Sequence, residues 1–222
     1  MISHRLFAVP SSSQRGEFIM RKKKKVSTRK VDILRTIKPY DLYLIFTFKK
    51  RAIVGKSKPN AENWSNKVFL YCSKDKKSFK RIPLQDQEWM QQYLGKVACM
   101  VHIDRIDDYQ NCFISDVKNA SDELTIKPLL EASQLTLEEL RDYTYNQGPF
   151  DCIYAWYVNG IVQHGYPQDL LQFRNACDKR KCVGCEFYNS EKANACEHTS
   201  YAITCINVVT RPPQNYCYIM GD

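Results

Sequence analysis

Five side chains able to bind a metal ion lie close together near the C-terminal end of the sequence. They are Cys177, Cys182, Cys185, Cys196 and His198. A Cys-x2-Cys pair lets two thiolates from one tight turn reach the same tetrahedral ion, and the basic residues at 179–181 favour thiolates. We therefore expect the four cysteines to bind one structural zinc ion in a Cys-rich insertion, residues 174–200, with His198 as an alternative ligand. An iron–sulfur site and unrelated free thiols are the alternatives.

The other six cysteines lie in or near apolar segments and are interpreted as small core residues: Cys72, Cys99, Cys112, Cys152, Cys205 and Cys217. The basic run at 21–25 is not followed by the apolar segment of a secretory signal. The cysteine content then favours a reducing compartment, so we expect a cytoplasmic protein. The apolar stretch at 42–48 is too short for a bilayer, and we expect no membrane association.

A second group of residues suited to binding is the basic segment at 49–58. It contains Lys49, Lys50, Arg51, Lys56 and Lys58, and the aromatic residues Trp64 and Tyr71 follow it. Cations that hold phosphates beside aromatic rings that stack on bases are typical of nucleic-acid binding. The alternative is a solvated strand edge whose charges oppose aggregation, with the aromatic rings in the core.

The net charge of +9 is distributed unevenly along the 222 residues. Residues 1–30 carry nine basic residues and one acid, residues 31–81 carry thirteen and four, and residues 82–222 carry eleven and nineteen. The first third is therefore basic and the remainder acidic. A uniform coating for nucleic acid is excluded, whereas one positive face is compatible with this pattern.

The segments that position these residues alternate between strands and short helices. We predict strands at 31–37, 51–54, 67–72, 96–104, 152–158 and 216–219, from their β-branched and aromatic content. Helices are predicted at 39–46, where Pro39 suits the first turn, at 85–94 and at 167–173. A further helix begins at the capping box of Thr136 and Glu139, and Asn159-Gly160 indicates a turn. Five or more strands with few helices indicate an α+β fold built on a small β-barrel.

The order of these segments resembles the ASCH domain, a PUA-like β-barrel. The residues that carry the likeness are Ile33–Pro39, Lys67–Cys72, Gly95–Val97, Tyr154–Trp156, Thr210–Gln214 and Tyr216–Cys217. The likeness covers roughly residues 31–219. Within the family, the chain resembles ASCH-like proteins of bacteriophages and prophages. It implies one ASCH/PUA-like domain at 31–222, with short helices flanking the barrel and the Cys-rich insertion within it.

ASCH domains carry a G-x-K-x-x-E-x-R pattern at a helix-to-strand junction that lines a cleft for RNA or a modified nucleotide. In this chain Lys50 stands at the lysine, whereas Phe48, Ile53 and Gly55 stand at the glycine, glutamate and arginine. Arg51 falls where an acetylcytidine amidohydrolase of the family has a threonine. The junction supplies neither a base nor an activated nucleophile, so we predict no catalytic residue.

The resemblance implies that further residues face the same cleft. Arg211 and Gln214 would hydrogen-bond a base or phosphate, and Trp156 would offer a stacking surface or belong to the core. The predicted nucleic-acid contacts are therefore Lys38, Lys49, Lys50, Arg51, Lys56, Lys58, Trp156, Arg211 and Gln214.

Our leading hypothesis is a non-catalytic module that binds RNA or another nucleic acid. The alternatives are a nucleoside-modifying enzyme of the amidohydrolase type, and a phage-encoded binder or inhibitor of a host defence protein. Residues 1–30 show no period, and we expect a disordered basic tail. Residues 14–20 can be encoded by a purine-rich, ribosome-binding-like stretch, so we expect Met20 to be the natural start.

Overall fold

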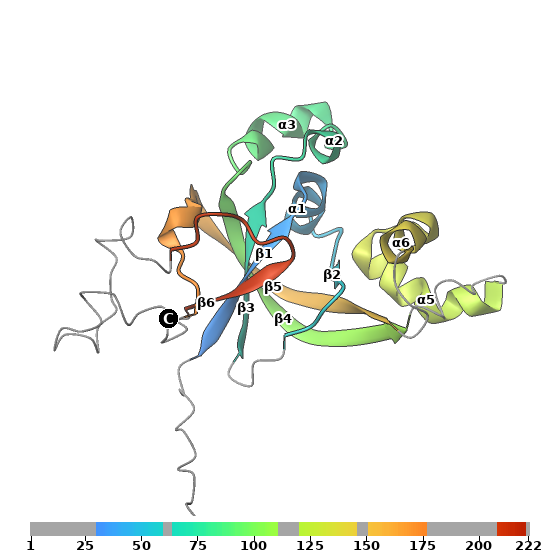
Figure 1. Cartoon of the computed structure of the whole chain (residues 1–222). Helices are drawn as coiled ribbons and strands as arrows, with labels where there is room; N and C mark the ends of the chain where they lie inside the picture. Colours follow the sequence, from blue (N-terminus) through green and yellow to red (C-terminus); the bar gives the residue numbers. More distant parts are fainter. Residues whose placement is uncertain (1–29, 60–63, 111–119, 146–150, 177–207, 221–222) are drawn as a thin grey trace, which may run out of the picture.

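A computed structural model describes residues 30–59, 64–110, 120–145, 151–176 and 208–220 (Figure 1). Residues 1–29 of the tail predicted at 1–30, with Met20, lie outside these residues, as do Cys112, Cys205 and all five predicted zinc ligands. Of the Cys-rich insertion, only residues 174–176 are described.

The described residues form one six-stranded sheet of mixed direction with the order β2-β5-β4-β3-β1-β6. Only β1 and β3 pair in parallel, and every other neighbouring pair is antiparallel. The strands are β1 (Val31–Ile37), β2 (Ala52–Gly55), β3 (Trp64–Cys72), β4 (Val97–Gln110), β5 (Cys152–Gln168) and β6 (Tyr216–Met220).

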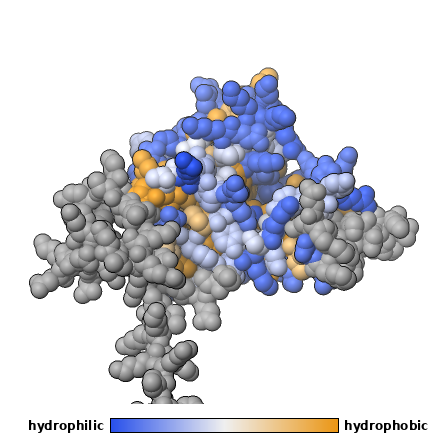
Figure 2. Space-filling view, in the orientation of Figure 1, coloured by the Kyte–Doolittle hydropathy of each residue, from blue (hydrophilic) through white to orange (hydrophobic). Residues whose placement is uncertain are grey.

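The helices gather in two groups at the sheet (Figure 1). One group holds α1 (Pro39–Phe46), α2 (Lys76–Phe79) and α3 (Leu84–Gln91), and the other holds α5 (Ala120–Ser133) and α6 (Leu137–Thr144). A 3-10 turn, η1 (Leu170–Gln172), follows β5. Figure 2 shows that the outer surface over α2 and α3 is mostly hydrophilic.

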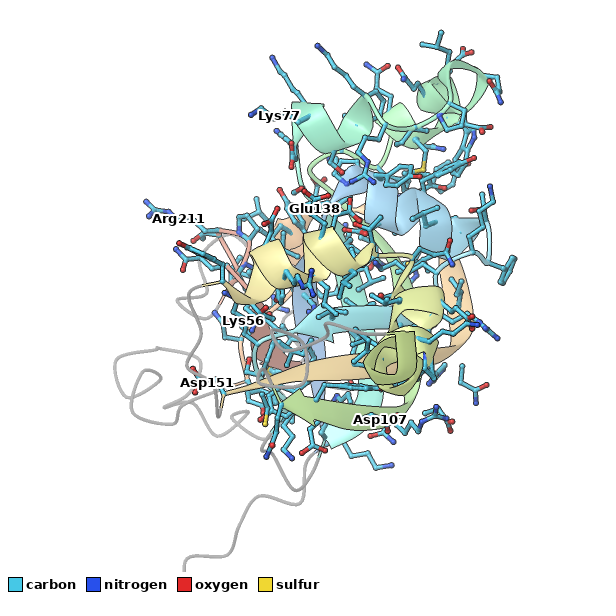
Figure 3. All side chains as sticks on the ribbon, turned by 90° about the vertical axis from the view of Figure 1, so that its right-hand side faces the viewer. Lys56, Lys77, Asp107, Glu138, Asp151 and Arg211 are labelled. Atoms are coloured by element: carbon cyan, nitrogen blue, oxygen red, sulfur yellow. The ribbon has the colours of Figure 1, made fainter. Side chains whose placement is uncertain are left out.

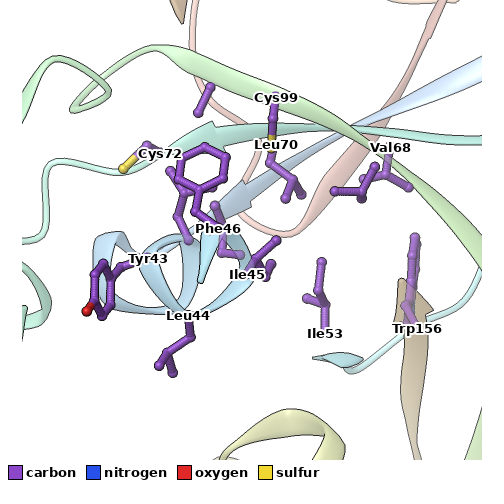
Figure 4. Packing of buried hydrophobic residues seen from close by; sticks show 14 of the residues in the cluster. Tyr43, Leu44, Ile45, Phe46, Ile53, Val68, Leu70, Cys72, Cys99 and Trp156 are labelled. Carbon is purple, nitrogen blue, oxygen red and sulfur yellow. The ribbon is translucent and has the colours of Figure 1, made fainter. Parts of the chain in front are cut away.

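The main core lies between the sheet and α1. It joins Leu42 and Ile45 of α1 to Val68 and Leu70 of β3 and to Trp156 of β5. All five residues are fully buried, and Figure 4 shows the packing of Ile45, Val68, Leu70 and Trp156. A second cluster packs α5 and α6 against β2 and β5 through residues such as Leu129 and Leu140. Sheet and helices therefore bury apolar side chains on both sides of β2 and β5, which fixes the position of β2.

The sheet is not closed among the described residues, so the predicted small barrel is corrected to an open, mixed sheet. β2 and β6 are its two edges. The Val54 carbonyl of β2 accepts a hydrogen bond from the Arg35 side chain at 2.6 Å. No backbone ladder joins the two edges in the part of the chain that the structure describes.

Most predicted elements are confirmed, with different ends. β1 and α1 match the prediction, and the Thr136 hydroxyl and Glu139 carboxylate cap α6 as expected. β5 runs through the predicted turn at Asn159-Gly160, where the pairing with β4 shifts register as in a bulge. The predicted helix at 167–173 is only the turn η1, and α2 and α5 were not predicted.

None of the helices in the described ranges combines the length and apolar character that a membrane span requires.

Candidate functional site

Three side-chain contacts connect β2 and the residues after it with β1 and β6. Arg35 Nη2 donates to the Val54 carbonyl at 2.6 Å, and Asn215 Nδ2 donates to Ser57 Oγ at 2.7 Å. Tyr216 Oη donates to the Lys58 carbonyl at 2.8 Å. We call this line of contacts the seam. The contacts of Asn215 and Tyr216 bring together segments 158 residues apart in the chain, and the Arg35–Val54 contact joins the edge strand β2 to β1, the neighbour of the other edge strand β6.

Arg35 is the buried cation of the seam. It lies on the same face of β1 as the core residues Ile33 and Ile37, and its side chain is 4% exposed. Its guanidinium carbon is 4.6 Å from the centroid of the Trp156 ring, a cation–π contact. Burial lowers the pKa of Arg35 to about 10, which leaves the guanidinium charged at neutral pH.

Gly55 makes room for this guanidinium. A Cβ at position 55 would lie 2.8 Å from Arg35 Nη2 and 3.0 Å from Arg35 Nη1. A larger residue would therefore displace Arg35. Gly55 stands where the ASCH pattern has an arginine, and the guanidinium next to it comes from β1.

The ring that the guanidinium contacts, Trp156, belongs to a cluster of aromatic rings. Trp156 contacts Trp64 and Tyr216 edge to face, with ring centroids 5.9 Å and 5.4 Å apart, and Tyr216 contacts Tyr218 at 5.9 Å. Trp156 itself is fully buried. The predicted core role of Trp156 is confirmed, and stacking on a base would be left to the less buried rings.

Two lysines form the outer rim of the seam, and both are exposed. Lys56 Nζ lies 5.1 Å from the centroid of the Tyr143 ring of α6, and Lys58 Nζ lies 5.4 Å from that of Tyr154 on β5. Figure 3 places Lys56 at the end of β2, beside α6. The pKa of Tyr143 is raised, chiefly by burial, so its phenol stays neutral. The rim thus offers two ammonium groups beside ring faces.

The remaining predicted contacts are less concentrated. Arg211 and Gln214 are exposed in the loop before β6, next to Asn215 of the seam, and Figure 3 shows Arg211 at the surface. Arg51 is exposed, and its backbone amide donates to the Ala132 carbonyl of α5 at 2.7 Å. Lys38, before α1, and Lys49 are exposed as well.

Lys50 differs from the other predicted contacts because its ammonium is buried. It lies 2.9 Å from Asp41 Oδ1 and donates to the Ser133 carbonyl at 2.5 Å, with 5% of the side chain exposed. The lysine that matches the ASCH pattern therefore makes an ion pair with α1 and a hydrogen bond to α5, and so links the two helices. Phe48 adopts φ 57°, a left-handed conformation that favours the glycine of that pattern.

Arg35, Tyr143 and Tyr216 were not among the predicted site residues. For Arg35 a signal exists in the sequence: a charged residue at a core-face position of an apolar strand. For the tyrosines, nothing in the local sequence distinguishes them from the other twelve.

The described cysteines have no chemical role suggested by the geometry. Cys72 and Cys99 are buried in the core as predicted, and burial raises the pKa of each thiol to about 12. Cys152 and Cys217 are partly buried. In the described part of the chain, no group of three or more His, Cys, Asp or Glu side chains is arranged to hold a metal ion. The zinc site stays a prediction.

No family model matches the chain, and no curated protein matches it. Its structure is similar to crystal structures of an ASCH protein from Zymomonas mobilis. A mutant of that protein is 13% identical and aligns over 87% of this chain and 90% of its own, with a TM-score of 0.46. A structure of the same protein without a stated mutation is 11% identical and aligns over 84% and 86%, with a TM-score of 0.41. These neighbours bear the name of the family that the sequence resembles. The phage-type assignment stays a prediction.

Proposed function

We propose that this chain is a non-catalytic module that binds RNA in single-stranded form along the seam. The observation that carries the proposal is the rim, where Lys56 and Lys58 hold exposed ammonium groups beside the rings of Tyr143 and Tyr154. Ammonium groups attract phosphates, and exposed ring faces accept stacked bases. The exposed Arg211 extends the positive charge on the β6 side.

The buried ion pair of Lys50 favours binding over hydrolysis. A lysine that activates a nucleophile or stabilises a transition state must reach the substrate, whereas Lys50 Nζ is directed to Asp41 and Ser133. Cys72 and Cys99 are protonated and buried, which makes them poor nucleophiles.

The test is the salt dependence of RNA binding by the double variant Lys56→Ala/Lys58→Ala. Fluorescence anisotropy with a labelled single-stranded RNA gives the affinity at several KCl concentrations. Each phosphate contact on a single strand contributes about 0.7 to the slope of log K against log salt. Loss of two contacts should therefore reduce the slope by about 1.4 and weaken binding to all sequences alike.

The matched control is Lys76→Ala/Lys77→Ala, which makes the same change in net charge on the exposed side of α2. Figure 3 shows Lys77 on α2, away from Lys56. The control should retain the wild-type slope. Equal losses in both variants would reduce the proposal to unspecific attraction. Absent or salt-insensitive binding would contradict it and favour a host-protein partner, and turnover of acetylated nucleosides would favour the enzyme.

A further inference from the structure

Two buried hydrogen-bond donors in the seam have no acceptor among the described residues. They are Nη1 of Arg35 and Nε1 of Trp156. Both atoms are buried, and the two side chains are in contact, with 4.6 Å between the guanidinium carbon and the ring centroid. Buried donors in folded proteins are nearly always paired, so two neighbouring exceptions need a physical reason.

A purely structural role for Arg35 leaves that reason open. The hydrogen bond from Nη2 to the Val54 carbonyl links β1 to β2, but it involves only one nitrogen of the guanidinium, and a neutral donor could make it as well. The other two Trp side chains in the chain do have partners, since Trp64 Nε1 donates to the Lys67 carbonyl and Trp89 Nε1 donates to Asp86. The unpaired indole is therefore particular to Trp156.

The charge of Arg35 also has no paired carboxylate among the residues that the structure describes. The groups that influence it electrostatically are Tyr143, Tyr216 and Asp41. Both phenols are neutral at neutral pH, and burial raises their pKa values further, while Asp41 is paired with Lys50. A buried cation without a counter-charge is costly, so the site as a whole favours an anion with several acceptor oxygens.

We propose that Arg35 and Trp156 form a buried subsite for one phosphate group, which in the proposed function belongs to the bound RNA. Oxygens of one phosphate accept from Arg35 Nη1 and Trp156 Nε1, and the anion neutralises the guanidinium. Lys56 and Lys58 lie at the rim and attract the strand toward this subsite. The contacts over the seam from Asn215 and Tyr216 are made by side chains, so the seam can open without breaking the backbone ladder of the sheet.

The experiment titrates the 15N-labelled full chain with inorganic phosphate and follows the three indole N–H resonances by NMR. The resonance absent from Trp156→Phe identifies Trp156. It should shift and saturate, whereas those of Trp64 and Trp89, whose N–H groups are already bonded, should move little. Sulfate should compete, and chloride at equal ionic strength should not.

Variants of Arg35 separate this subsite from a nonspecific effect. Arg35→Gln keeps a donor but removes the charge and should abolish the Trp156 shift, whereas Arg35→Lys keeps the charge and should weaken phosphate binding about tenfold or more. If Arg35→Gln does not fold, Trp156→Phe serves instead. Its affinity for inorganic phosphate, measured by calorimetry, should also fall about tenfold or more. No Trp156 shift in the wild type, or an undiminished shift in Arg35→Gln, overturns the subsite.

Two further probes identify the source of the phosphate and separate the two proposals. An RNA with a 5′-hydroxyl offers only phosphodiesters, and the same RNA with a 5′-phosphate adds a terminal phosphomonoester. A shift of the Trp156 resonance with either RNA supports the subsite. A shift with both RNAs identifies a diester as the ligand, and a shift with the second RNA alone identifies the terminal monoester. RNA binding that depends on Lys56 and Lys58 but leaves Trp156 unshifted overturns the subsite alone. A Trp156 response to inorganic phosphate without RNA affinity supports the subsite and overturns the proposed function.

Discussion

The buried ion pair between Lys50 and Asp41 should stabilise the fold and have little effect on RNA affinity. The two side chains are 5% and 29% exposed, and Lys50 also donates to the Ser133 carbonyl at the end of α5. We predict that Asp41→Asn destabilises the protein more than Lys50→Met. The first leaves a buried ammonium beside a neutral amide, whereas the second leaves a carboxylate that water already reaches.

The magnitudes follow from the exposure of the two groups. Breaking a fully buried pair costs about 3–5 kcal/mol. Because Asp41 is partly exposed, solvent screens the pair, and we expect about 2–3 kcal/mol for Asp41→Asn. For Lys50→Met we expect about 1–2 kcal/mol, mainly from the Ser133 carbonyl that loses its donor. At about 2–4 °C per kcal/mol for a chain of this size, Asp41→Asn should lower Tm by about 4–12 °C.

The assay is urea unfolding of the two single variants and the double variant, with RNA anisotropy measured in parallel. The double variant should lose less free energy of unfolding than the sum of the singles, since it leaves neither charge behind. RNA affinity should stay within about twofold of wild type. Wild-type stability in Lys50→Met together with lost RNA affinity would refute this reasoning and restore Lys50 as a binding residue.

Three other predictions are independent of the seam. The chain should contain about one zinc ion by metal analysis, and Cys185→Ser should lower the zinc content; wild-type protein free of zinc would contradict the cysteine-cluster hypothesis. Deletion of residues 1–19 should leave Tm unchanged, and a clear fall would count against both the disordered tail and the Met20 start. Thr136→Ala should cost about 1 kcal/mol in urea unfolding through the lost cap bond to the Glu139 amide, whereas Thr136→Ser should retain most of the stability.

The segments that sequence predicts well are those whose signals are local. Pro39 fixes the start of α1, and the capping box at Thr136 fixes that of α6, because proline geometry and side-chain caps act within a few residues. Ile33 and Leu34 of β1 point to opposite faces and are both fully buried, as is typical of a strand whose sheet is covered on both faces.

The lengths of β4 and β5 depend on long-range pairing and could not be predicted in the same way. Charged residues after Ile103 and the Asn159-Gly160 pair indicate ends of strands when taken alone. In the structure β4 and β5 pair with each other as far as Gln110 opposite Cys152, and Gly160 lies opposite His102. Tertiary pairing thus overrides a local turn signal, and a register shift accommodates it.

The candidate site shows the same division between local and long-range information. Sequence places Lys50 and Arg35 in different classes, one in a basic segment and one in an apolar strand, yet both cations are buried. What separates them is pairing: Lys50 has Asp41, nine residues earlier, and Ser133, 83 residues later, whereas Arg35 has a carbonyl and a ring but no counter-charge among the described residues. A buried cation whose charge the fold already neutralises contributes to stability, and one left without an anion is free to recruit a ligand. Charge density along the sequence cannot make this distinction, because it depends on which acid the fold brings to each cation.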